Sequence, residues 1–83
     1  MKILYFAWLR LRIGKDQEEV KPPTSVTDIA GLVAWLKTRG SAYTEVLADL
    51  SIIRFAVNQE FAELTTSINQ GDEIAIFPPI TGG

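Results

Sequence analysis

Residues 3–9 read Ile-Leu-Tyr-Phe-Ala-Trp-Leu, and this unbroken apolar run is the strongest indication of the fold. A strand with one solvated face would alternate apolar and polar side chains, so a run without alternation indicates a strand with contacts on both faces. Residues 74–77, Ile-Ala-Ile-Phe, repeat this character near the other end of the chain. Both strands are therefore expected near the centre of one sheet. As neighbours they would run parallel and need a right-handed crossover connection that contains a helix.

Between these strands the apolar period changes to that of a helix. Residues 25–40 begin with Ser25 as the expected N-cap and Asp28 as its capping-box partner, and Gly40 is the expected stop. Apolar residues at helical spacing form one stripe, Ile29, Leu32, Val33 and Leu36. The pattern predicts one main helix packed across the sheet.

Shorter segments fill the rest of the chain. Residues 10–13 are expected to continue extended or to turn, and a turn at 14–16 leads into a short strand over 17–21. A helical turn is expected over 44–50, with Val46, Leu47 and Leu50 pointing inward, and strands over 52–57, 61–64 and 73–77. This order predicts the α+β class and the β-grasp arrangement, a small mixed sheet with one main helix. The expected organisation is a single domain over residues 1–83 with a flexible C-terminal tail, residues 78–83.

Composition excludes several kinds of function. The chain has 83 residues, a net charge of −2, and neither cysteine nor histidine, which removes thiolate chemistry and the usual metal sites. No basic stripe interleaves with aromatic residues, so a nucleic-acid partner is not expected. The N-terminal apolar run is too short to span a membrane, and Arg10 and Arg12 interrupt any signal-peptide pattern. We expect a cytoplasmic protein with no membrane partner, no metal and no bound cofactor.

The two apolar strands also predict an exposed surface. One helix covers one face of a sheet, yet both strands are apolar on both faces. Contiguous exposed apolar area usually marks a partner site. The alternative is that loops and residues 44–50 cover the second face.

The C-terminal tail carries the candidate chemistry. Pro78-Pro79 stiffens its base, and Gly82-Gly83 gives it a tip without side chains that can enter a narrow channel. Six extended residues reach about 20 Å. A carboxylate becomes electrophilic once it is activated as an acyl-adenylate, and without Cys or His in the chain a partner must supply the activating groups. The chain is therefore interpreted as a substrate or carrier, although two glycines could also be a purification scar or a frayed end.

Motifs that match a known family are distributed along the chain. They are Tyr5-Phe6-Ala7 with Leu9-Arg10 and Gly14, then Ala56-Val57-Asn58-Gln59, and residues 71–83, Gly-Asp-Glu-Ile-Ala-Ile-Phe-Pro-Pro-Ile-Thr-Gly-Gly. With these motifs the sequence resembles the small subunits of molybdopterin synthase, a family of sulfur carriers. The last block is the specific part, and residues 15–50 match only in pattern.

The resemblance implies a ubiquitin-like β-grasp fold and a defined chemistry. Gly83, preceded by Gly82, would be adenylated with ATP by a ubiquitin-activating-like adenylyltransferase and converted to a thiocarboxylate. The tail would then enter the large subunit of molybdopterin synthase, in a heterotetramer, and pass its sulfur to a cyclic pyranopterin. The implied partner-binding residues are Phe6, Phe61, Ile76, Phe77, Pro78, Pro79, Ile80 and Thr81. Ile76 departs from the aromatic residue expected in the family.

Three other functions stay open at this point. A sulfur carrier of thiazole synthesis would share the fold and the terminal glycines, but Phe77-Pro78-Pro79 argues against it. A protein modifier would join lysines through the same carboxyl group, and an interaction domain would carry the glycines incidentally. Asp72 and Glu73 are interpreted as turn residues, with pairing to basic residues of an activating enzyme as the alternative.

Overall fold

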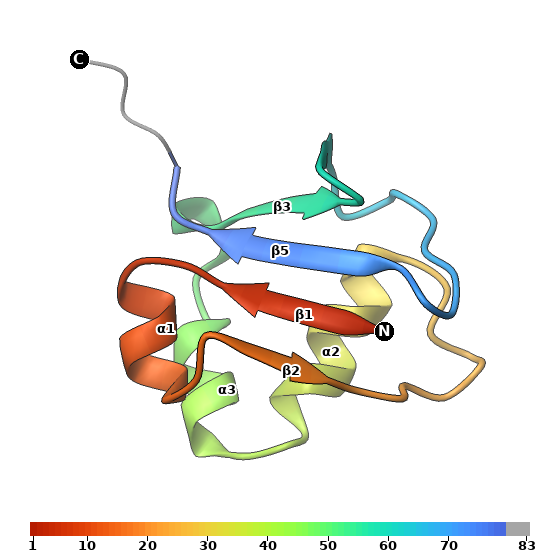
Figure 1. Cartoon of the computed structure of the whole chain (residues 1–83). Coiled ribbons are helices and arrows are strands. Elements are labelled where there is room, and N and C mark those ends of the chain that lie inside the picture. Colours follow the sequence, from red (N-terminus) through yellow and green to blue (C-terminus); the bar gives the residue numbers. More distant parts are fainter. Residues whose placement is uncertain (80–83) are drawn as a thin grey trace.

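The fold is that of a computed structural model, in which residues 1–79 are described. Four of the predicted site residues, Ile80, Thr81, Gly82 and Gly83, lie outside the described residues. Within residues 1–79 the strands are β1 (Lys2–Tyr5), β2 (Gln17–Glu19), β3 (Arg54–Val57), β4 (Glu60–Ala62) and β5 (Glu73–Phe77). They form one mixed sheet in the order β2-β1-β5-β3-β4 (Figure 1).

The two apolar end strands are neighbours inside this sheet. β1 and β5 pair in parallel, with Ile3 opposite Ile74 and Tyr5 opposite Ile76. On its other side β5 pairs with β3 in the antiparallel sense. The prediction that the first and last strands lie side by side and run parallel is therefore confirmed.

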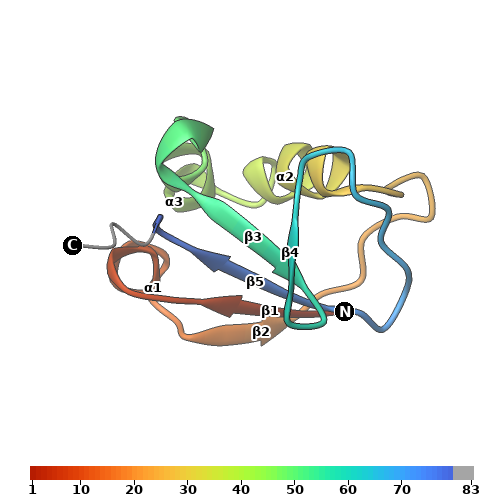
Figure 2. The same cartoon turned by 90° about the horizontal axis from the view of Figure 1, so that it is seen from above.

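Helices cover one face of the sheet. α2 (Ile29–Lys37), α3 (Ser41–Val46) and the 3-10 helix η1 (Leu50–Ile52) lie on the same side, as Figure 2 shows. Alternate side chains of the central strands meet them in the core. The fully buried large residues are Ile3, Leu9, Ile29, Leu32, Leu36, Leu47, Ile74 and Ile76.

The expectation that residues 10–13 continue extended or turn is wrong. β1 ends at Tyr5, and α1 (Trp8–Ile13) follows at the end of the sheet. Ala7, with φ 56°, turns the chain out of the sheet, and Leu9 then becomes fully buried. The helix ends at Gly14, whose φ of 89° is a left-handed cap that glycine adopts without strain. The helix could not be seen in the sequence, because Leu9, Leu11 and Ile13 alternate with Arg10 and Arg12 at the period of a strand.

The predicted ends of the main helix are also wrong. Asp28, not Ser25, is the N-cap, and its Oδ1 accepts a hydrogen bond of 2.8 Å from the Gly31 amide. The Ile29 amide donates to the Thr66 carbonyl and the Ala30 amide to the Leu64 carbonyl. The start of the helix therefore depends on hydrogen bonds to residues far along the chain.

At the other end α2 stops at Lys37 with Thr38 as its C-cap, and Gly40 instead precedes α3. The helical turn expected over 44–50 is therefore α3, which starts three residues earlier, followed by η1 at Leu50. Val46 and Leu47 are buried as predicted, while Leu50 is only partly buried.

Candidate functional site

The sheet face opposite α2 and α3, which we call the open face, has an apolar centre. In the register of the sheet, Leu4, Ala75, Ala56 and Phe61 form one row across β1, β5, β3 and β4. Small alanines occupy the middle of the row and larger side chains its ends. This arrangement makes the centre of the face shallowly concave.

Aromatic and proline side chains bound this face where β5 ends. Phe6, Ala75, Phe77, Pro78 and Pro79 line a shallow groove of about 430 Å³. The Phe77 ring also packs against that of Phe61, with centroids 6.0 Å apart and planes inclined by 51°. The groove thus leads along the base of the C-terminal tail.

Two of the predicted contact residues are exposed on this face. Phe6 is 46% exposed and Phe61 is 81% exposed, which is unusual for phenylalanine in a small domain. Figure 2 shows α2 and α3 on the other side of the sheet. The prediction of an uncovered apolar face is therefore confirmed, whereas binding of a partner there stays a prediction.

The placement of Ile76 on this face is wrong. Ile76 is fully buried because it lies opposite Tyr5 in the ladder, and both side chains point toward the helices. Adjacent residues of a strand point to opposite faces, so Ala75 and Phe77 hold the positions on the open face. Phe77 is thus the aromatic residue of β5 that lies on the open face.

The base of the tail leaves the sheet at a defined place. β5 ends at Phe77, and Pro78 and Pro79 continue from the end of the sheet that also holds α1 (Figure 1). Four further residues follow Pro79 in the sequence, and four residues span at most about 14 Å. A protein that binds the groove would therefore hold the chain within about 14 Å of Gly83.

Asp72 builds a turn. Its carboxylate accepts hydrogen bonds from the Asn69 amide at 2.7 Å and from Asn58 Nδ2 at 3.1 Å. The Asn58 side chain in turn accepts from the Glu73 amide at 3.0 Å. These bonds favour the interpretation of Asp72 as a turn residue. The alternative role of Asp72 and Glu73 toward an activating enzyme stays a prediction.

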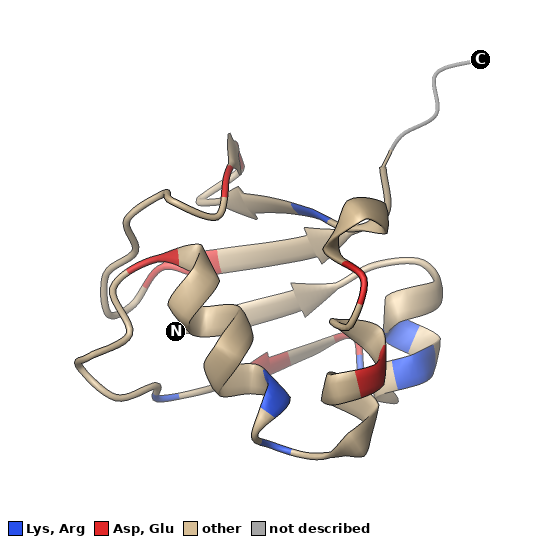
Figure 3. Cartoon of the chain, turned by 180° about the vertical axis from the view of Figure 1, so that it is seen from behind, with Lys and Arg blue, Asp and Glu red and all other residues tan. Residues whose placement is uncertain are grey.

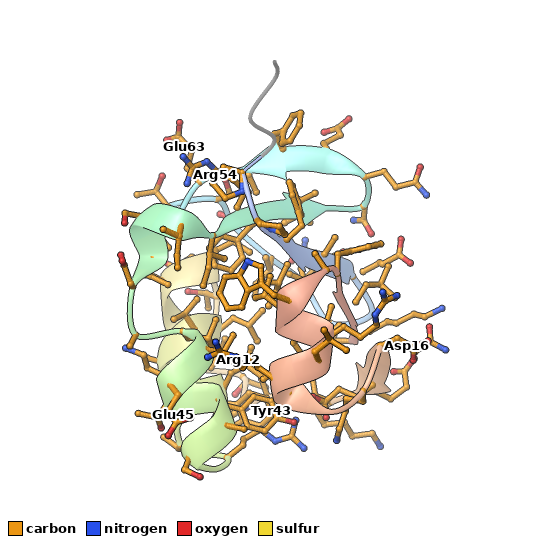
Figure 4. All side chains as sticks on the ribbon, turned by 90° about the vertical axis from the view of Figure 1, so that its left-hand side faces the viewer. Arg12, Asp16, Tyr43, Glu45, Arg54 and Glu63 are labelled. Carbon is orange, nitrogen blue, oxygen red and sulfur yellow. The ribbon has the colours of Figure 1, made fainter. Side chains whose placement is uncertain are left out.

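A polar cluster on the helical side escaped the sequence interpretation. The Glu18 carboxylate accepts hydrogen bonds from the Tyr5 and Tyr43 hydroxyls, each at 2.7 Å, and from Arg39 Nη1 at 2.9 Å. Lys15 Nζ lies 3.4 Å from the same carboxylate. Figure 4 shows Tyr43 between α3 and α1. The only available signal was a Glu at the inward position of a short strand.

The ionisation of this cluster follows from its contacts. Burial of Glu18 opposes its charge, but the hydrogen bonds from Tyr5, Tyr43 and Arg39 outweigh burial and lower the pKa of the carboxyl group. Burial, and then the hydrogen bond to Glu18, raise the pKa of both tyrosines. Donors of the same chain occupy the acceptor sites of the Glu18 carboxylate. The cluster therefore stabilises the packing of β2 against the helices and does not form a reactive site.

Charged residues elsewhere are dispersed. On the helical side, Lys and Arg lie on α1 and at the end of α2, and acidic residues lie before α2 and on α3 (Figure 3). Within residues 1–79, no three His, Cys, Asp or Glu residues are grouped as a metal ion would require. None of the helices formed by these residues is long and apolar enough to cross a membrane.

Comparison with known proteins places this geometry in context. A molybdopterin synthase sulfur carrier subunit from Dictyostelium discoideum is 37% identical over 84 residues, covering 99% of this chain and 94% of that protein. The Escherichia coli protein of the same name is 31% identical over 83 residues, covering 100% and 99%.

Solved structures share the fold. SAMP1 from Haloferax volcanii superposes with a TM-score of 0.79 at 25% identity, covering 100% of this chain and 98% of that one. A putative molybdopterin converting factor subunit 1 from Pyrococcus furiosus gives 0.76 at 26% identity, covering 95% of each chain. The predicted ubiquitin-like β-grasp fold is confirmed. The sequence model of the ThiS family matches residues 3–83, and the chain therefore belongs to the ThiS family.

Proposed function

We propose that this chain is the sulfur carrier subunit of a molybdopterin synthase and that Gly83 carries the sulfur as a terminal thiocarboxylate. The observation that carries the proposal is the position of Gly82-Gly83, four residues or fewer beyond an apolar groove that ends at Pro79. The name shared by relatives of similar length supports it.

The chemistry would take place on other proteins. A ubiquitin-activating-like adenylyltransferase would join the Gly83 carboxylate to the α-phosphate of ATP and release pyrophosphate. Hydrosulfide from a sulfur donor would then attack the acyl carbon, a C–S bond would replace the C–O bond to AMP, AMP would leave, and a thiocarboxylate would remain. The chain itself, without Cys or His, supplies the carboxyl group and the surfaces that present it, and binds no cofactor.

The open face would bind the large subunit of the synthase, with two copies of each subunit in a heterotetramer. Docking over Phe6, Phe61 and Phe77 would bury apolar side chains that residues 1–79 leave exposed or half-buried. The groove along Pro78 and Pro79 would then direct the tail toward the site where a cyclic pyranopterin receives the sulfur. We place this assembly in the cytoplasm, where both substrates would be met.

The fold alone does not choose among carboxyl-terminal carriers. A thiazole-synthesis carrier or a protein modifier would be compatible with a β-grasp domain and Gly-Gly. The names of the sequence relatives favour the molybdopterin carrier, and so does the Phe77-Pro78-Pro79 wall of the groove.

Intact-mass spectrometry tests the proposal. The chain would be incubated with the adenylyltransferase, ATP and a sulfur donor, and we expect a species in which sulfur replaces one oxygen at the C-terminus. Adding the large subunit and cyclic pyranopterin monophosphate should return the original mass and form molybdopterin.

Two variants make the test specific. A chain that lacks Gly83, and one with an alanine added after it, should fold normally and form no molybdopterin. Lys21→Met, a change at an exposed residue after β2, serves as the control with full activity. Molybdopterin formation by either tail variant, or the absence of the sulfur-containing species in the parent chain, would refute the proposal. High-mass conjugates in place of free thiocarboxylate would indicate a modifier instead.

A further inference from the structure

Arg54 brings a positive charge to the apolar end of the open face. It is the first residue of β3 and lies opposite Phe77 in the β3–β5 ladder. Its exposed side chain lines a pocket of about 320 Å³ together with Phe61, Phe77 and Pro79. The cation thus shares a surface with two phenylalanine rings and the base of the tail.

The guanidinium group is held in place by the backbone. Arg54 Nη1 donates hydrogen bonds to the Ser51 carbonyl at 3.2 Å and to the Ile53 carbonyl at 2.9 Å. A guanidinium has five N–H donors in a planar fork, so one nitrogen anchors the group while donors remain on the other two. The side chain is therefore oriented before any partner arrives, which reduces the entropy lost on binding.

The ion pairs formed within residues 1–79 do not include Arg54. Their acidic partners are Glu18 and Glu19. Glu63 lines the adjoining groove with Arg54, and Figure 4 shows both residues at the same end of the molecule, yet they form no ion pair. At the other end of the open face, Lys2 of β1 lies opposite Glu19 of β2 and Glu73 of β5.

A protein that covered this face would take Arg54 out of water. Removing an isolated charge from water is unfavourable unless an opposite charge is supplied. A carboxylate matches the arginine fork with two parallel hydrogen bonds, and arginine is enriched in protein interfaces for this reason. The apolar neighbours Phe61 and Phe77 indicate that the approaching surface is that of a protein.

We propose that Arg54 pairs with an Asp or Glu side chain on the contact surface of the protein that docks over the open face. This rests on the proposed function, in which that protein is the large subunit of molybdopterin synthase. The pocket ends at Pro79, four residues before the end of the sequence. Arg54 is thus a positioning residue that fixes the register of the tail and does not touch the reacting carboxyl group.

Binding to the large subunit of the same organism, measured by titration calorimetry, tests this pairing. Arg54→Met keeps the aliphatic stem and removes the charge, and we expect it to weaken binding at least about tenfold at low salt. Arg54→Lys should recover part of the loss. Lys21→Met removes one positive charge from an exposed position outside the pocket and should stay within about twofold of the parent. The advantage of the parent over Arg54→Met should shrink as the salt concentration rises.

Synthase kinetics separate positioning from a general loss of structure. With thiocarboxylated chains, Arg54→Met should raise the KM for the carrier and leave kcat unchanged, and its melting temperature should match that of the parent. A compensating pair, Arg54→Glu with an Asp→Lys or Glu→Lys change on the large subunit, should restore binding that Arg54→Glu alone loses.

The outcomes distinguish this inference from the proposed function. If the parent binds and transfers sulfur while Arg54→Met binds as tightly as Lys21→Met, the pairing is refuted and the carrier function stands. If the parent chain does not bind the large subunit at all, both are refuted. If none of the Asp→Lys and Glu→Lys changes on the large subunit restores binding to Arg54→Glu, the pairing is also contradicted.

Discussion

Ala7 adopts φ 56° and ψ −134°, a conformation in which an L residue is strained and glycine is not. The strain lies where the chain leaves β1 for α1, directly after Phe6 of the open face. Ala7 is exposed, so replacing it loses little packing. We expect Ala7→Gly to raise the free energy of unfolding by about 1 kcal/mol, because relief of about 1–3 kcal/mol of strain exceeds the entropy that glycine adds to the unfolded chain. Urea unfolding followed by tryptophan fluorescence would measure it.

The matched control is Ala34→Gly on the exposed side of α2. There the backbone is helical and unstrained, so the same chemical change should lower the free energy of unfolding by about 0.5–1 kcal/mol. Destabilisation by both variants would show that Ala7 stores no strain.

Glu18 gives a pH-dependent prediction. Its folded-state pKa is lowered below the ordinary value of 4.5, so its contribution to stability is complete above pH 4.5 and is lost as the pH falls through the lower folded-state pKa. Glu18→Gln should lower the free energy of unfolding by about 2 kcal/mol at pH 7, since hydrogen bonds to a charged group are lost. The difference from the parent should shrink below pH 4.5 in urea titrations. A constant difference from pH 7 to 3 would contradict this account. The control Glu45→Gln, at an exposed position on α3, should change the free energy of unfolding at pH 7 by less than about 0.5 kcal/mol.

Among the elements, α2 begins at a different residue in the structure than the sequence pattern predicts. The pattern placed the N-cap at Ser25, whereas Asp28 accepts the capping hydrogen bond from Gly31. Asp28→Ala should cost about 1 kcal/mol of unfolding free energy, within the usual range for a lost N-cap. Ser25→Ala, at an exposed position, should change it by less than about 0.5 kcal/mol. Chemical denaturation of the two variants in parallel tests which residue begins the helix.

The elements that the sequence predicted correctly are those with a clear period or a clear neighbour. The parallel β1–β5 pair followed from two apolar strands, and α2 from its apolar stripe. α1 could not be predicted, because Arg10 and Arg12 alternate with apolar residues at the period of a strand, not of a helix. The first turn of α2 could not be placed, because the carbonyls of Leu64 and Thr66 that receive its amides lie far along the chain.

In the candidate site, too, some residues could be predicted from the sequence and others could not. Gly82-Gly83 and the prolines were visible as a motif, Phe6 as an apolar residue with no helix to cover it, and Phe61 only through the family resemblance. Ile76 was misplaced because its face depends on where β5 enters the ladder, and a shift of one residue exchanges the two faces. The place of Arg54 beside Phe77 could not be predicted from the sequence, because it depends on the register between β3 and β5.

At the scale of the whole molecule, the sheet divides into a face that holds the fold together and a face free to bind. Ile76→Ala should cost about 2–5 kcal/mol of unfolding free energy, because it opens a cavity under the helices. Phe61→Ala should cost less than about 1 kcal/mol, since its ring is 81% exposed and loses chiefly its contact with Phe77. Yet Phe61→Ala should weaken binding to the large subunit by at least about tenfold if the open face is the interface. Unfolding curves and binding titrations on both variants measure the two quantities. Unchanged binding by Phe61→Ala would show that partners dock elsewhere, because a stable fold removes misfolding as the explanation.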